Sequence, residues 1–476
     1  MLFLFILIPL LFVVMFNLPA KGQAYKVSFW LSLLVCFSQV LVAVLRPAFL
    51  WNNNSPAALP FFNFNLSSDP LSLIMFLTIG LAAFFALIVG YNTIKDKKSV
   101  FNFINLLLLS LVGMNGIVLA SDIFTLYVFL EITSVCSFIL IALNNDKFAL
   151  EGAFKYIMLS AVATVLMLSS IALILILYGS TSFLVIKASL HNANPHFLVV
   201  LSVILFVCGL FIKGGLVPFH GWLADAYSAA PAGVSVLLAG IVTKASGIYT
   251  LIRILVFVFD YSANTKAIVM FVGAVSIVLG ALLSLRQTDF KRMLAYSSIS
   301  QIGYIVLSAG CGSALGIAAA AFHLFNHTVL KSLLFTNSAA VESQLNSTEM
   351  NRMGGLSIKM PVTGFTSVVG FLSVAGIPPL SGFWSKLLIV VALWAAGQYI
   401  YAVIAVLASV LTLAYFLALQ RKVFFGKLAA GLENTSEAGA GIVFSEIALA
   451  VITVAAGVFF PWVMVNFIFP VQNLLR

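Results

Sequence analysis

The sequence predicts an all-α protein that crosses a membrane about fourteen times and contains two inverted five-helix repeats, each with a broken helix. Of its 476 residues, 62% are hydrophobic and 8% are charged, and the mean hydropathy of +1.16 is far above that of a soluble domain. Apolar runs of roughly 18 to 25 residues recur throughout, each long enough to cross about 30 Å of hydrocarbon. Two runs are interrupted by glycine and proline at corresponding places.

The first predicted span is a retained helix, because it lacks a basic leading region and a convincing cleavage site before Lys21. The polar and aromatic segment 51–68 is expected to form an external loop near the headgroups. No soluble domain fits between the spans. In chain order, the predicted spans are 1–19, 27–48, 69–92, 100–121, 123–143, 153–178, 197–219, 231–256, 267–285, 293–309, 312–338, 361–397, 400–420 and 440–469.

Positive charge is divided unequally between alternate loops. Loops after odd-numbered spans, with the adjoining helix ends, carry 15 of the 24 Lys and Arg residues. Because cytoplasmic loops are enriched in these residues, both termini are predicted outside the inner membrane of a prokaryotic cell. This topology accounts for the net charge of +10 and gives no reason to expect a nucleic-acid partner. The opposite loops and the C-terminus carry Arg46, Lys187, Arg253, Lys266 and Arg476.

The chain lacks the spacing of a cofactor or metal centre. Its four cysteines are widely separated within apolar runs and are interpreted as buried small hydrophobes, with no disulfide framework or cluster ligation. There is no P-loop, and the glycines of 310–316 miss the dinucleotide-binding spacing. We therefore expect no cofactor in this chain, and any enzyme activity would belong to a complex.

Ionisable side chains occur deep inside five predicted spans, where a charge costs about 2.5 kcal/mol or more and indicates a functional site. Glu131 and Lys244 lie near the middle of their spans. Lys213 is followed by Gly214, Gly215 and Pro218, which would interrupt its helix.

Lys386 follows a similar interruption at Pro378, Pro379 and Gly382. In the eleventh span, His323, His327 and Lys331 are spaced i, i+4 and i+8, so they project from one helix face. A metal site is disfavoured because no carboxylate is nearby in sequence. Acid, amine and imidazole groups together favour a proton relay.

Each of these residues also has a structural interpretation. Lys331 and Lys386 would need no function if they lay nearer an interface, and His323 is compatible with a packed, hydrogen-bonded histidine. Glu446 lies near the start of the last span, and helix-end solvation accounts for it. The same explanation, with an i,i+4 pair, covers Glu151 and Lys155. For Asp225, capping and gating remain equally plausible.

The two broken helices predict a repeated architecture. Each is the fourth helix of a five-helix unit, so Lys213 and Lys386 become pseudosymmetric, one for a half-channel open to each side. The predicted divisions are flanking helices in 1–99, a first repeat in 100–258, a second repeat in 266–427 and a last helix in 428–476.

Six ordered segments resemble the antiporter-like subunits shared by respiratory complex I, membrane-bound hydrogenases and Mrp-type cation/proton antiporters. They are LEITS, IKGGLVPFHGWLADAYSAAP, VTKASGIY, DFKRMLAYSSISQIGY, HLFNHTVLKSLLF and GIPPLSGFWSK. The resemblance implies that Glu131 pairs with Lys213, and that Lys244 links the halves through a hydrated axis. It places His323, His327 and Lys331 on that axis and makes Lys386 the terminal exchange site. Candidate gating residues are His220, Asp225, Pro218, Pro378 and Pro379.

The resemblance implies a cofactor-free subunit that moves H⁺ or Na⁺. It would be driven by electron transfer in peripheral redox subunits that hold iron–sulfur clusters, nickel–iron or quinone sites. Other membrane subunits, including paralogous antiporter-like ones, and lipid would surround it. Lys386, where one relative has glutamate, favours the hydrogenase and Mrp branches, whereas Ala224 departs from the proline of many relatives. The alternatives are an Mrp-type Na⁺/H⁺ exchanger without a redox partner and a structural scaffold.

Overall fold

The computed structural model describes residues 2–18, 24–45, 57–58, 65–192, 197–259 and 262–474. Within these residues the fold is all-helical, as predicted, apart from a two-residue antiparallel pairing of β1 (Ala57–Ala58) with β2 (Asn65–Leu66). Lys21, Arg46, Arg476 and most of the predicted external loop 51–68 lie outside the described residues.

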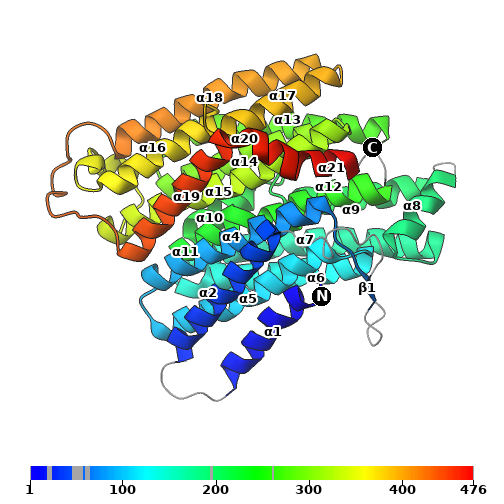
Figure 1. Ribbon diagram of the computed structural model, residues 1–476, viewed down its shortest axis with the longest axis horizontal. Coiled ribbons are helices and arrows are strands. Elements are labelled where there is room, and N and C mark those ends of the chain that lie inside the picture. The colour runs from blue at the N-terminus through cyan, green and yellow to red at the C-terminus, as the bar shows by residue number, and fades with distance from the viewer. Residues whose placement is uncertain are drawn as a thin grey trace.

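The helices lie side by side in a bundle, with the N-terminal and C-terminal elements on its outside (Figure 1). Nine described helices have the length and apolar composition to cross a membrane. They are α2 (Ala24–Leu45), α4 (Pro70–Thr93), α5 (Lys97–Leu119), α6 (Ile123–Ile141), α7 (Lys147–Tyr178), the continuous stretch 232–259, α13 (Ala263–Leu285), α18 (Tyr399–Val423) and α19 (Ala440–Val458).

Four apolar helices are shorter, namely α1 (Leu4–Asn17), α9 (Phe197–Lys213), α16 (Pro361–Ala375) and α17 (Ser381–Ala395). Two long helices, α14 (Phe290–Gly310) and α15 (Ala314–Leu345), belong to neither group. Both are almost wholly buried and rich in polar side chains. Because other helices shield them from lipid, they do not need an apolar surface.

Aspartate side chains fix where many of these helices begin. Asp69, Asp96, Asp122, Asp146 and Asp289 each accept a hydrogen bond from the backbone N–H three residues later. This bond satisfies one of the amide groups left unpaired at a helix N-terminus. With Asp146 as its cap, α7 starts six residues before the predicted boundary at 153. The prediction missed this part of the helix because polar residues in its first turns lower the local hydropathy.

Two predicted spans differ from the observed elements, and one observed helix was not predicted. The stretch 232–259 alternates α-helix (α11, Ala232–Leu237; α12, Thr250–Ile254) with π-helical turns (η2, Leu238–Val242; η3, Lys244–Tyr249; η4, Leu255–Phe259). The predicted span 440–469 is not one helix, since α19 ends before Pro461, which cannot extend it. The chain then changes direction (Figure 1) into α20 (Phe460–Val463), η7 (Met464–Ile468) and α21 (Phe469–Leu474). A further helix, α8 (Phe183–Asn192), was not predicted.

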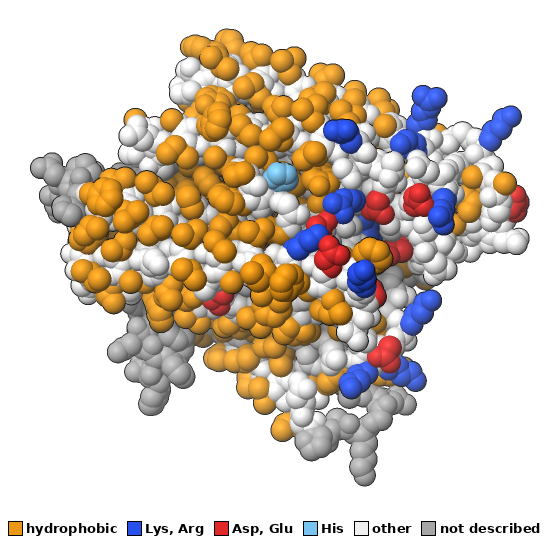
Figure 2. All heavy atoms as spheres, turned by 180° about the vertical axis from the view of Figure 1, so that it is seen from behind, with side chains coloured by type: hydrophobic (Ala, Val, Ile, Leu, Met, Phe, Trp, Pro, Cys, Tyr) orange, Lys and Arg blue, Asp and Glu red, His pale blue; other side chains and the backbone are white. Residues whose placement is uncertain are grey.

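Figure 2 shows hydrophobic side chains over most of one face, with Lys, Arg, Asp and Glu gathered mainly toward one edge. An apolar belt beside a charged rim is the surface expected of a protein embedded in lipid.

Candidate functional site

Lys213 and Glu131 form an ion pair at the first helix interruption. Helix α9 ends at Lys213, the chain turns, and α10 (Gly221–Ala229) begins the second half-helix. Lys213 Nζ lies 3.0 Å from Glu131 Oε1 and donates to Ser134 Oγ at 2.9 Å and Ser160 Oγ at 3.3 Å. Glu131 also accepts a bond from Thr164 at 2.9 Å. All three ammonium donors of Lys213 therefore have acceptors.

The interruption is in direct contact with the π-helical stretch that carries Lys244. A Cβ at Gly247 would lie 2.3 Å from Gly214 Cα, so only glycine permits the two backbones to approach this closely. Lys244 itself is fully buried, and its ammonium donates to the carbonyl of Ala239. The sequence did not predict the π-helical turns, which are frequent at functional sites.

His323, His327 and Lys331 line one face of α15, and all three are buried. The two imidazole rings are nearly parallel, with centroids 6.4 Å apart. Lys331 Nζ donates to the Leu294 carbonyl at 2.8 Å and to Ser297. Among the described residues, neither ring nitrogen of His327 has a hydrogen-bond partner. Buried polar groups in this situation are normally satisfied by internal water.

Lys386 lies just after the second interruption, one turn into α17. Helix α16 ends at Ala375, and Gly376 follows with a φ of 88°, a left-handed conformation that glycine adopts at little cost. The Lys386 ammonium lies 4.8 Å from the centroid of the Tyr304 ring. Within the described part of the chain no acceptor bonds it. Next to it in sequence, Ser385 Oγ contacts His323 Nδ1 at 2.9 Å, which joins this interruption to α15.

Four of the five candidate gating residues lie in the interruptions or directly before α10. Pro218, Pro378 and Pro379 lie in the interruptions themselves. His220 is the residue before α10, where its side chain makes no capping bond.

Asp225 lies inside α10 and does not cap it, so the capping interpretation is wrong. Its carboxylate contacts Lys155 at 2.7 Å and Arg292 at 2.8 Å, and thereby joins α7, α10 and α14. Lys155 also makes the predicted pair with Glu151 at 2.7 Å.

The interpretation of Glu446 as a solvated helix-end residue is also wrong. Its side chain is completely buried and bonded to Asn337 and Thr363. The error arose because α15 and α16, which carry these two partners, pack against α19 and cover its first turns. The residue pattern of α19 alone does not show which other helices pack against it.

Two ion pairs with buried cations were not predicted from the sequence. Arg253 contacts Asp69, and Lys291 Nζ lies 2.6 Å from Glu342 Oε2. Arg253 and Lys291 belong to the predicted loop and helix-end charges, yet their side chains are 7% and 3% exposed. Each partner is distant in the sequence, so no local spacing signals either pair.

Replacing Asp69 by Asn is expected to lower the free energy of unfolding by about 3–5 kcal/mol, because the change leaves the buried Arg253 charge uncompensated. Asparagine still caps α4, so loss of the cap does not contribute. Thermal unfolding of the purified protein in detergent measures the effect. The matched control is Asp96→Asn at the exposed cap of α5, where Ser99 takes the place of Ser72 and stability should not change. Equal stability of the two variants would contradict a structural role for the Arg253 pair.

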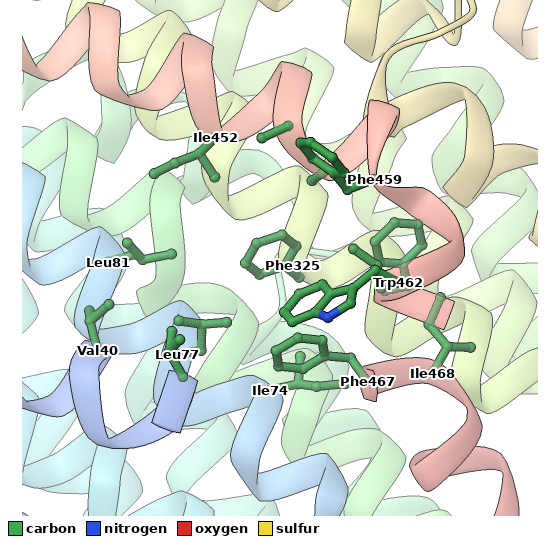
Figure 3. A pocket seen from close by; sticks show the side chains of 15 residues that line it. Val40, Ile74, Leu77, Leu81, Phe325, Ile452, Phe459, Trp462, Phe467 and Ile468 are labelled. Atoms are coloured by element: carbon green, nitrogen blue, oxygen red, sulfur yellow. The ribbon is translucent and has the colours of Figure 1, made fainter. Parts of the chain in front are cut away.

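A cavity of about 630 Å³ lies between α2, α4, α15 and the C-terminal elements (Figure 3). Its lining includes Val40, Leu77, Phe325, Phe459 and Trp462, and none of the described lining residues is ionisable.

Interrupted helices with buried lysines define the class of this protein as a polytopic membrane protein with an ion-transport-type core. Residues 120–412 match the family described as NADH:quinone oxidoreductase/Mrp antiporter, transmembrane. The chain belongs to this family, which confirms the resemblance found in the sequence.

Three comparisons illustrate the family relationship. The chain is 29% identical to a Na⁺/H⁺ antiporter subunit of Alkalihalophilus pseudofirmus, over 74% of this chain and 71% of the relative. It is 32% identical to a NADH-quinone oxidoreductase subunit of Desulforudis audaxviator, over 75% and 72% of the two chains. A chain of the Mrp complex from Dietzia superposes with a TM-score of 0.91 at 24% identity, covering 100% of this chain and 97% of that one. The last likeness concerns the fold alone.

Proposed function

We propose that this antiporter-like subunit translocates H⁺ or Na⁺ through a relay of carboxylate, amine and imidazole groups. The observation that carries the proposal is the Lys213–Glu131 pair at a helix interruption. An ammonium and a carboxylate in contact hold an ion pair or, after one proton moves, a neutral pair. Such a pair can accept and release charge at membrane depth without a large change in structure.

The relay would continue from Lys213 past the contact between Gly214 and Gly247 to Lys244. From there it would follow the α15 face through His327 and Lys331, and through His323 to Lys386. The unpartnered nitrogens of His327 support this route, because they need water, and water conducts protons between side chains.

The proposed architecture comprises fourteen membrane-spanning segments. It counts α14 and α15 as spans and each interrupted pair, α9 with α10 and α16 with α17, as one span. The first inverted repeat occupies 100–258 and the second 266–427, with flanking helices in 1–99 and 428–476. Both termini would lie outside the inner membrane. The matching positions of the two interruptions support this division.

We propose that redox subunits drive the transport. The relationship to a NADH-quinone oxidoreductase subunit supports this context. Iron–sulfur, nickel–iron or quinone sites would then reside in peripheral and membrane partners, including paralogous antiporter-like subunits. The relationship to a Na⁺/H⁺ antiporter subunit favours the second candidate, an Mrp-type Na⁺/H⁺ exchanger without redox subunits.

Purification of the native complex, mass spectrometry of its subunits and reconstitution into vesicles test the proposal. We expect redox subunits to co-purify, and electron transfer to generate a pH or Na⁺ gradient. If only small membrane subunits co-purify and an imposed Na⁺ gradient moves protons, the exchanger is correct. A complex that moves neither ion would contradict both proposals and leave the scaffold interpretation.

A further inference from the structure

A second buried carboxylate site lies outside the proposed relay, where α19 meets α15 and α16. Glu446 is completely buried in the second turn of α19. Its Oε1 accepts a bond from Asn337 Nδ2 at 2.8 Å, and its Oε2 lies 3.1 Å from Thr363 Oγ1. No Lys, Arg or His of the described residues lies within ion-pair distance of the carboxyl group. An unpaired carboxylate in such a place is strongly disfavoured, and the usual solution is to bind a proton.

The same threonine hydroxyl also contacts a second carboxylate. Thr363 Oγ1 lies 2.9 Å from Glu437 Oε2, so it bridges Glu437 and Glu446. A hydroxyl has one proton to donate. With two carboxylates and one proton, one of the contacts would be between two acceptors. Both contacts become hydrogen bonds only if one carboxyl group is protonated and donates to the threonine oxygen.

The surroundings decide which carboxyl group carries this proton. Glu437 is partly exposed, and its Oε1 accepts the backbone N–H groups of Val362 at 2.6 Å and Thr363 at 3.3 Å. These amides begin α16, where unpaired N–H groups favour a negative charge. Glu446 has no such donors among the described residues and faces the charge of Glu437, which further disfavours a second anion. The proton therefore belongs to Glu446.

With the proton on Glu446, the hydrogen bonds from Glu446 through Thr363 to Glu437 are all donated outward, toward the bundle surface. Glu446 Oε2–H donates to Thr363 Oγ1, whose hydroxyl proton is donated to Glu437 Oε2 at the bundle surface. On the inner side, Asn337 Nδ2 donates to Glu446 and to Thr366 at 2.9 Å. Its Oδ1 is buried without a hydrogen-bond partner in the described structure, and Asn337 lies on α15, six residues after Lys331. The Asn337 Oδ1 therefore remains an open acceptor on the α15 side of Glu446.

We propose that Glu446 is a protonated carboxylic acid that exchanges its proton with the aqueous phase through Thr363 and Glu437. In a transfer event, the Glu446 proton moves to Thr363 as the threonine proton moves to Glu437, which becomes neutral and releases a proton to water. Glu446 then remains an anion until it regains a proton, either from the aqueous phase through Thr363 or from the α15 side. The site serves as a port that joins the surface at the α18–α19 loop to α15 at Asn337, and in this role it rests on the proposed function.

Infrared spectroscopy of the purified complex tests the protonation state independently of transport. We expect a carbonyl band of a protonated carboxylic acid at neutral pH that shifts in D₂O and is lost in Glu446→Gln. Glutamine is a neutral isostere that keeps the bond from Asn337. If the band survives in this variant, Glu446 is not its source and the proposal is overturned. Because this readout needs no ion flux, it stands even if the complex proves not to transport ions.

The bridging hydroxyl is tested by Thr363→Val in reconstituted vesicles. We expect the rate of proton translocation to fall roughly tenfold, since the change removes the hydroxyl that bridges the two carboxyl groups, and Thr363→Ser should restore most of it. The matched control is Thr453→Val on α19, a buried threonine whose hydroxyl bonds within its own helix to the Leu449 carbonyl. Equal rates in both valine variants would exclude Thr363 as a proton carrier. If the carbonyl band of the protonated acid is absent and the infrared spectrum shows carboxylate absorption that depends on Na⁺, the site binds sodium, and the proton port is contradicted.

Discussion

Replacing Lys213 by Ala is expected to abolish ion translocation by the reconstituted complex, with a residual rate at least about a hundredfold below that of the native protein. The ammonium is the partner of Glu131 at the interruption, and no other amine of the described residues lies within ion-pair distance of that carboxylate. Without it, Glu131 keeps its bond to Thr164 but has no group with which to exchange a proton. Fluorescent pH and Na⁺ indicators inside the vesicles measure the loss.

The control for this variant is Lys422→Ala in the exposed last turn of α18, which removes one positive charge without touching the relay. It should transport at the native rate. Assembly of the Lys213→Ala complex is verified by its subunit composition, because a missing subunit would also abolish transport. A fully assembled complex with an unchanged gradient would favour the scaffold interpretation and rule out Lys213 as a relay group.

Replacing Gly382 by Ala is expected to destabilise the second interruption by about 3 kcal/mol, the upper part of the range for overpacking. A Cβ at this position would lie 1.8 Å from the carbonyl oxygen of Ser373. Since the obstacle is backbone, α17 must move away from α16, and Lys386 one turn later moves with it. We expect a lower unfolding temperature and a loss of translocation together.

The matched control is Gly221→Ala. Gly221 begins the half-helix after the first interruption, as Gly382 is near the start of the half-helix after the second, but a Cβ there meets nothing within 4 Å. This variant should be as stable as the native protein. If both alanine variants unfold at the native temperature, the close contact at Gly382 does not hold the interruption in place.

The positions of the interruptions were predictable because their cause is local. Gly214, Gly215 and Pro218 end α9 through their own backbone preferences, and Gly376 with Pro379 does the same after α16. The family was predictable because its motifs are also local. Those around Glu131 and Lys213 can be recognised in order along the sequence without knowledge of the loops between them.

The contacts of Asp69, Asp225 and Glu446 were not predictable from the sequence, because each joins helices far apart in the chain. Asp225 bonds to residues 70 positions earlier and 67 positions later. Hydropathy also gave the wrong boundary for α7, where the capping bond of Asp146 sets the start of the helix.

The sequence by itself determined that this chain is helical, embedded in a membrane and interrupted at two lysines, because composition, helix period and glycine–proline chemistry act over a few residues. Beyond the pair of Glu131 with Lys213, which the resemblance implied, only the tertiary structure decided which buried charges are paired. Arg253 has Asp69, Lys386 lies over the face of Tyr304, and Glu446 is fully buried with no cation beside it among the described residues. The physical reason is that the state of a buried charge depends on all groups within a few ångströms, and helix packing alone brings those groups together.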